Sequence, residues 1–179
     1  MRISLIVLLS ILIIGCAAPT PSPSPTPTPT PTPTPIPTPP AQGAYIDPIY
    51  FEGSKGEEID FYLKVKIPEA VSGGEAVIKF DPGVFELVSV DVGDIFGEDP
   101  LIGVEEADGS KGVIRYALAR KGRTYGKAEG SFIKFRLKIK EEAGEGEYKI
   151  RIEKMGLCDE NFEDITFGTY DSTVKVIGE

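Results

Sequence analysis

Apolar and polar residues alternate along much of the chain beyond residue 43. Every second side chain from Ile59 to Ile67 is apolar, and so is every second side chain from Ile133 to Ile139. Successive side chains of a β-strand point to opposite faces, so this alternation predicts strands over residues 58–67 and 131–140, each with one buried and one solvated face. Shorter or less regular patterns predict further strands at residues 45–51, 76–80, 85–92, 101–106, 114–118, 148–152 and 174–176.

Turn-forming residues separate these segments. Asp81-Pro82-Gly83 and Ser72-Gly73-Gly74 are two examples, and Gly, Pro and Asp are the residues that favour turns. Parallel strands buried on both faces would be apolar throughout, which the one-sided alternation contradicts. About nine strands without a helical period therefore predict an all-β fold, an antiparallel β-sandwich.

The first fifteen residues are typical of a signal peptide. Met1-Arg2 precedes an apolar stretch, residues 3–14, which is too short to cross a bilayer comfortably as a helix. Ile13-Ile14-Gly15-Cys16 resembles the lipobox of bacterial and archaeal lipoproteins, in which the signal is cut before a cysteine that is then lipidated. We therefore expect a signal peptide at residues 1–15 and lipidation of Cys16. A plain signal peptide with an incidental cysteine is the alternative.

A Pro/Thr-rich linker follows. Residues 19–40 hold twelve of the sixteen prolines, and alternating Thr-Pro favours an extended polyproline-II rod, about 70 Å long at about 3.1 Å per residue. We divide the chain into the signal peptide (1–15), the lipidated cysteine with its linker (16–43) and a folded domain (44–179). This arrangement predicts a protein held on the extracellular face of the cell membrane by its lipid. An SH3-type ligand is the weaker reading of the prolines, since those partners are chiefly intracellular.

Composition argues against several function classes. The chain lacks histidine, the commonest general base and metal ligand, and its formal charge of −9 repels phosphate backbones. We expect no catalytic residue, no metal or cofactor on this chain, and no nucleic-acid partner. If Cys16 carries lipid, Cys158 has no disulfide partner, so the domain, which we expect to be monomeric, folds on its core alone.

Residues 80–94, Phe-Asp-Pro-Gly-Val-Phe-Glu-Leu-Val-Ser-Val-Asp-Val-Gly-Asp, resemble the aromatic-Asp-Pro, apolar, Gly-Asp run of cohesin domains. Residues 53–67, 126–137, 157–161 and 174–176 fit the same family, so the resemblance covers nearly all of residues 44–178. It implies a nine-stranded jelly-roll sandwich that binds dockerins, which are small calcium-loaded helical modules of other secreted proteins. Calcium is accordingly expected on the partner.

The resemblance also implies a binding face. In cohesins the dockerin lies across a sheet face made by the third, fifth, sixth and eighth strands. Val77, Ala117 and Ala119 are apolar at positions that the alternation places in solvent, which favours a dry centre of a binding face. Small exposed apolar residues are also common without a partner, and that reading stays open. The predicted partner-binding residues are Gly73, Glu75, Val77, Lys79, Val104, Glu106, Arg115, Ala117, Ala119, Lys149, Arg151 and Glu153.

Three other sites can be weighed. Tyr62, Tyr125 and Tyr170 could bind polysaccharide if they share a face, which makes a carbohydrate-binding sandwich the alternative function. Adjacent acids such as Glu141-Glu142 point to opposite faces of a strand, so they do not predict a glycosidase. Residues 159–164 carry acids like part of an EF-hand loop, but Asp164 stands where that loop needs glycine, which favours a solvated loop.

Overall fold

The computed structural model describes residues 37–122 and 126–178. The chain divides into two units, residues 1–34 and 35–179, and the second contains everything described below. The predicted signal peptide, Cys16, most of the predicted linker and Tyr125 lie outside the described residues. In the part that is described, no helix is long and apolar enough to cross a membrane.

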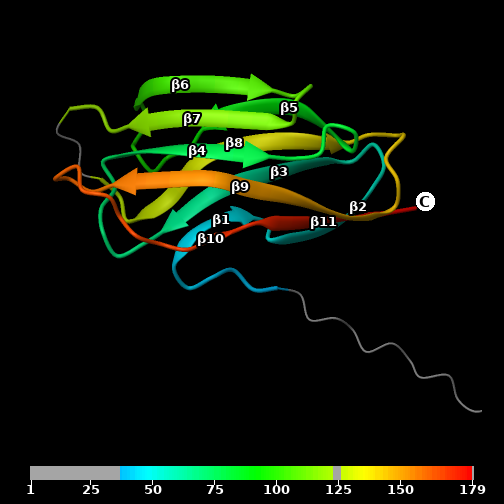
Figure 1. Cartoon of the computed structure of the whole chain (residues 1–179), viewed down its shortest axis with the longest axis horizontal. Helices are drawn as coiled ribbons and strands as arrows, with labels where there is room; N and C mark the ends of the chain where they lie inside the picture. Colours follow the sequence, from blue (N-terminus) through cyan, green and yellow to red (C-terminus); the bar gives the residue numbers. More distant parts are fainter. Residues whose placement is uncertain (1–36, 123–125, 179) are drawn as a thin grey trace, which may run out of the picture. The chain divides into compact units, whose positions relative to one another are not determined.

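Two sheets face each other in a β-sandwich (Figure 1). One sheet has five strands in the order β10-β1-β3-β8-β5, and the other has six in the order β2-β11-β9-β4-β7-β6. The strands are β1 (Gly43–Asp47), β2 (Tyr50–Ser54), β3 (Glu58–Lys66), β4 (Gly73–Lys79), β5 (Phe85–Val92), β6 (Leu101–Asp108), β7 (Val113–Ala119), β8 (Glu129–Ile139), β9 (Gly146–Cys158), β10 (Thr169–Tyr170) and β11 (Ser172–Ile177).

The predicted β-sandwich is confirmed, although several strands differ from the prediction; β9, expected over residues 148–152, continues to Cys158. Residues 45–51 do not form one strand, because the chain passes between the sheets at Asp47-Pro48, a cis peptide bond, and gives β1 in one sheet and β2 in the other. The two-residue β10 was also not predicted, so the described residues have eleven strands against about nine expected. Most neighbours are antiparallel, but β1 pairs with β10 and β2 pairs with β11 in parallel.

The inward positions of the alternating strands make the core. Phe61 and Phe135 stack with ring centroids 5.5 Å apart, and Phe96 meets Phe132 edge to face at 5.7 Å. These aromatic pairs, with buried Ile, Leu and Val from both sheets, join the two layers in one hydrophobic core. Because each core strand uses alternate residues for this purpose, the remaining residues of each sheet form two outer faces, which are the candidate binding surfaces.

Candidate partner-binding face

The twelve predicted residues all belong to four strands that are consecutive neighbours, β9-β4-β7-β6, in the six-stranded sheet. The core-facing residues of these strands, such as Ala76, Ile78, Ile114 and Leu118, are buried, which leaves the predicted residues on the outer side. We call this outer side of β4, β6, β7 and β9 the outer face. Strands that are far apart in sequence thus present one continuous surface (Figure 1).

Small and apolar side chains occupy the centre of the outer face. Val77 on β4 lies opposite Arg115 on β7, and Ala117 lies opposite both Glu75 on β4 and Val104 on β6. Val77, Ala117 and Val104 are half-buried by their neighbours. These three side chains are therefore uncharged although charged residues surround them, and the buried centre of a protein interface is likewise poor in charged residues.

Gly73 was expected to be exposed on the outer face, but it is buried. It lies opposite Ala119 and Cys158 on the two neighbouring strands. A Cβ atom built on Gly73 would lie 3.4 Å from the Cys158 Sγ and 3.5 Å from the Ala119 Cβ. Gly73 is thus on the predicted side of the sheet, but its neighbours cover it and it presents almost no surface.

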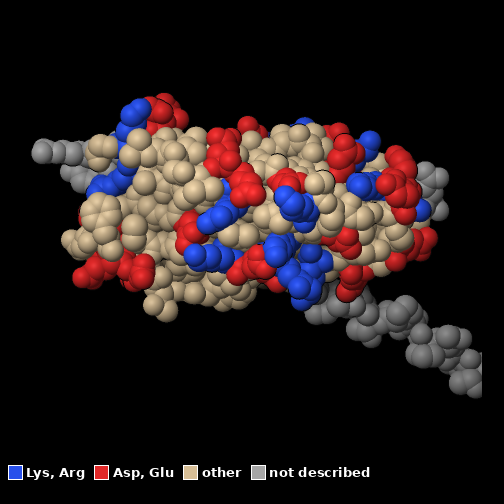
Figure 2. Space-filling view, turned by 45° about the horizontal axis from the view of Figure 1, so that its top comes forward, with Lys and Arg blue, Asp and Glu red and all other residues tan. Residues whose placement is uncertain are grey.

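Ion pairs surround the apolar centre. Lys79 Nζ lies 2.8 Å from Glu153 Oε1, and Lys154 pairs with Glu75. Arg115 lies across from Glu106 in the strand register. In Figure 2, Lys, Arg, Asp and Glu mingle over the middle and right of the visible surface, and uncharged residues form most of its left part. The charges are therefore mixed in sign, which suits a polar rim and not a nucleic-acid surface.

Two β-bulges change which residues reach the outer face. The register of β9 against β4 shifts so that Val77 lies opposite Lys154 while Ile78 lies opposite Ile152, which leaves Glu153 as the extra residue. Beyond this bulge the outer positions of β9 are Lys154, Gly156 and Cys158, all three missed by simple alternation. The sequence does carry the signal, because the apolar positions change from even numbers (Ile150, Ile152) to odd numbers (Met155, Leu157). A second bulge at Gly103 shifts β6 in the same way.

The outer side of the five-stranded sheet has a different character. Arg136 donates two hydrogen bonds to Asp60, of 2.7 and 3.1 Å, and Lys134 Nζ lies 3.3 Å from the same carboxylate. The hydrogen bond from Arg136 is the largest cause that holds the pKa of Asp60 below its usual value. Lys64 pairs with Asp47 at 2.6 Å. Paired charges thus cross the middle of this side, whereas the middle of the outer face of the six-stranded sheet is apolar.

The tyrosines proposed for sugar binding have only part of the required arrangement. Tyr62 lies on the outer side of the five-stranded sheet, where the ammonium groups of Lys64 and Lys134 lie 5.8 and 5.5 Å from its ring centroid. Tyr170, on β10 of the same sheet, is exposed. A sugar stacks on an open aromatic face, and the ammonium groups of the two lysines would compete with a sugar for the ring of Tyr62.

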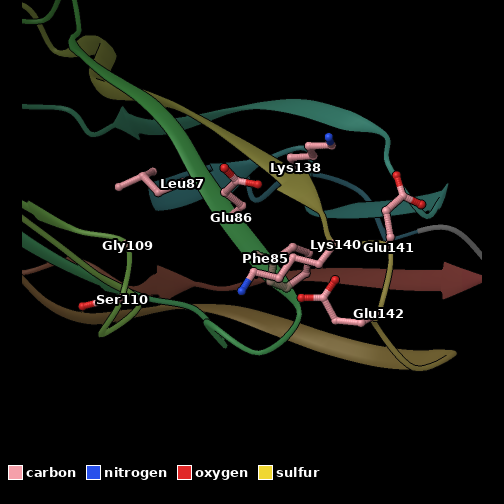
Figure 3. A pocket seen from close by; sticks show the side chains of 9 residues that line it. All are labelled: Phe85, Glu86, Leu87, Gly109, Ser110, Lys138, Lys140, Glu141 and Glu142. Atoms are coloured by element: carbon pink, nitrogen blue, oxygen red, sulfur yellow. The ribbon is translucent and has the colours of Figure 1, made fainter.

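The adjacent acids do not converge on a reaction centre. Glu105 accepts a 3.1 Å hydrogen bond from the Tyr116 hydroxyl, whereas Glu106 faces Arg115 on the outer face. Burial of Tyr116, together with that hydrogen bond, raises its pKa to about 12. The side chains of Glu141 and Glu142 point in different directions at the rim of a surface hollow of about 510 Å³ (Figure 3).

Asp159 organises the loop that resembles part of an EF-hand. Its Oδ1 accepts hydrogen bonds from the backbone N–H groups of Asn161 (2.8 Å) and Glu163 (2.9 Å). These hydrogen bonds lower the pKa of Asp159, and the one donated by the Glu163 N–H group has the largest effect. The carboxylate therefore closes a turn within its own loop, and no group of three or more Asp, Glu, Cys or His side chains that could hold a metal occurs in residues 37–122 and 126–178.

The fold is that of solved cohesins. A type II cohesin from the cellulosome of Acetivibrio cellulolyticus matches with a TM-score of 0.65 at 18% identity, over 75% of this chain and 95% of that chain. The structure of a Coh-OlpA-Doc918 complex from Clostridium thermocellum, a type I cohesin–dockerin complex, matches at 0.64 and 17%, over 75% and 98%. A non-cellulosomal cohesin from the hyperthermophilic archaeon Archaeoglobus fulgidus gives 0.62 and 13%, over 76% and 91%.

At these identities the structural likeness shows the fold alone. No curated protein sequence matches the chain. The family follows from the sequence itself, because residues 51–176, well over half of the chain, match the model of the cohesin domain. The chain belongs to the cohesin family.

Proposed function

We propose that this protein is a non-catalytic, cell-surface-anchored module that binds a dockerin domain through the outer face and so recruits secreted proteins to the cell. Membership of the cohesin family supports the class of partner, and complexes of related folds with dockerins support it further. The lipobox-like Cys16 and the Pro/Thr-rich linker support attachment to the extracellular side of the membrane.

One observation carries the choice of surface. The outer face carries the uncharged side chains of Val77, Ala117 and Val104 on three adjacent strands, with the Lys154–Glu75 and Lys79–Glu153 pairs beside them. The middle of the opposite side is instead crossed by the Asp60–Arg136 and Asp60–Lys134 pairs. Burying paired charges under a partner costs their hydration, and burying half-exposed aliphatic groups releases water favourably. The first surface is therefore the better one to cover.

A flat surface also suits a folded partner better than a small substrate. Two of the hollows on the described part of the chain have volumes of about 510 and 550 Å³, and charged residues of both signs line them. Small-molecule sites are lined predominantly by apolar side chains, whereas charged residues make up much of the lining of these hollows. A protein that lies across several strands fits the geometry.

The test is capture of calcium-loaded dockerin modules, made from the dockerin sequences of the same genome, by the full chain in mild detergent. We expect at least one dockerin to bind, and EDTA to abolish binding because the dockerin loses its calcium-bound fold. Soluble and insoluble polysaccharides are tested beside them. Retention of polysaccharide with no dockerin bound would replace the proposal by the carbohydrate-binding alternative.

A further inference from the structure

One end of the outer face is apolar. Here β6 and β4 begin and β7 and β9 end, so that Leu101, Ala119, Gly73 and Cys158 form one row across four strands in register. Leu101 is 53% exposed, and its neighbour Ile102 is 48% exposed at the free edge of the sheet. An uncharged strip therefore crosses the sheet and continues the apolar centre towards this end.

Phe162 lies in the loop that leaves the same end, four residues beyond Cys158. Its side chain is 81% exposed, which makes it the most exposed large apolar residue of residues 37–122 and 126–178. Contact of a phenyl ring with water is unfavourable, and Phe162 is not among the described residues that pack in or against the hydrophobic core. The exposure of Phe162 has no explanation in the packing of the domain.

The backbone at Phe162 adds a second, independent observation. Its φ angle is +64°, in the left-handed region, where Gly or Asn fits and a bulky side chain is an outlier. Phe162 is the one residue other than glycine that has a positive φ among the described residues. Such strain persists where surrounding structure enforces it, and it occurs often at binding sites.

The surrounding loop does enforce this conformation. Phe162 N–H donates to the Asp159 carbonyl at 3.2 Å, and Asp159 N–H donates to the Glu163 carbonyl at 3.0 Å. The Asp159 carboxylate accepts the hydrogen bonds described above, and Arg120 at the end of β7 pairs with Glu160 at 3.1 Å. A rigid loop presents its aromatic ring with little conformational entropy left to lose on binding.

We infer that Phe162 is an anchor residue for the dockerin, inserting its ring into an apolar pocket of that partner at the Leu101–Cys158 end of the outer face. This inference rests on the proposed function and adds to it a residue, an end of the face and a chemistry for the partner surface. The partner should therefore carry an uncharged, ring-sized pocket where it extends past the end of β9. Aromatic residues are enriched in the buried parts of protein interfaces, and a side chain that fills a desolvated pocket of the partner can supply much of the binding energy.

The test compares variants of the full chain in mild detergent, titrated with the calcium-loaded dockerin that binds the unaltered chain. Phe162→Gly and Phe162→Asn both suit a positive φ, so the loop should keep its shape. We expect each to weaken binding at least about 30-fold while the melting temperature stays the same or rises by a few degrees. Phe162→Tyr keeps the ring and should bind within about threefold of the unaltered chain.

Val88→Ala is the matched control, because Val88 is 45% exposed at a bulge of β5 in the other sheet. It should leave the affinity unchanged. If both Phe162 variants bind like the unaltered chain while Val77→Asp weakens binding, the inference about Phe162 is wrong and the proposed function stands. If no dockerin of the panel binds the unaltered chain, the proposed function and the inference are both rejected.

Discussion

A substitution at Val77 tests the proposed function with little expected damage to the fold. It lies opposite Arg115 on one side and Lys154 on the other, so the carboxylate introduced by Val77→Asp would face two cations. Val-to-Asp replacement in a strand costs up to about 1 kcal/mol in intrinsic preference, and each opposite-charge cross-strand pair returns about 0.2–1 kcal/mol. The free energy of unfolding should therefore change by less than about 1 kcal/mol.

Binding should respond far more strongly. In a complex the new carboxylate would lose its water beneath the partner, and the aliphatic contact of Val77 would be lost as well. A buried polar group that is imperfectly paired costs about 2–4 kcal/mol, which corresponds to about 30- to 1000-fold weaker binding. Ala117→Lys provides a second disruption, because Glu75 opposite Ala117 can pair with the added ammonium group and preserve the fold.

Isothermal titration calorimetry with the captured dockerin measures the affinity, and differential scanning calorimetry measures the stability of each variant. Lys138→Ala on the outer side of the five-stranded sheet is the control and should bind normally. Unaltered dockerin affinity in both Val77→Asp and Ala117→Lys would refute the assignment of the outer face. A large fall in melting temperature would instead refute the stability argument from the cross-strand pairs.

Three further predictions concern stability. Asp94 accepts hydrogen bonds from the Ser131 N–H and hydroxyl groups at 2.8 and 2.7 Å, and these, the backbone one above all, hold its pKa well below the usual value. The ionised carboxylate therefore stabilises the fold above the unfolded-state pKa of about 3.9, and this contribution falls as the pH drops through the lower folded-state pKa. Thermal melts from pH 6 to pH 2 should show a smaller decline for Asp94→Asn than for the unaltered chain, and equal declines would contradict this role. Gly112→Ala should cost at least about 2 kcal/mol in urea unfolding, because φ is +64° and the new Cβ would lie 2.1 Å from the Phe80 carbonyl oxygen; full stability would show that the turn can relax. Phe61→Ala should lose about 3–5 kcal/mol in the same assay, since Phe61 is fully buried against Phe135, and a loss under about 1 kcal/mol would mean that the core collapses around the gap.

The regular strands could be predicted from the sequence because their signal is local. Phe85–Val92 was predicted with the bounds that the structure has, and the alternation from Ile59 to Val65 gave the correct buried side of β3. Alternation shows which residues of a strand avoid water. It is visible in the sequence of a half-buried strand alone, without knowing which strands lie beside it. The family resemblance then supplied the choice among outward faces, which alternation alone does not make.

Other features depend on pairing between distant segments. Residues 45–51 carry one continuous strand-like pattern, yet β1 pairs with β3 while β2 pairs with β11, so the change of sheet follows from partners as far as about 120 residues away. The bulge at Glu153 likewise exists only as a register shift against β4, and it moved Lys154 onto the outer face. The change from even-numbered to odd-numbered apolar positions in β9 indicated where the alternation breaks. A bulge, however, is defined by the pairing of two strands, so one strand's sequence does not establish it.

The sequence by itself determined that the chain beyond the linker is a two-layered all-β domain and which side of each regular, bulge-free strand is apolar. The lack of histidine also excluded His-dependent catalysis. The grouping of β9, β4, β7 and β6 in one sheet followed from the family resemblance and not from the residue pattern. Only the tertiary structure showed that Gly73 is covered and that Phe162 stands exposed in a strained turn at the end of that face. The division has a physical reason. The preference of a side chain for burial is a property of each residue and can be seen in the sequence. A binding surface is made by side chains that only long-range strand pairing brings together.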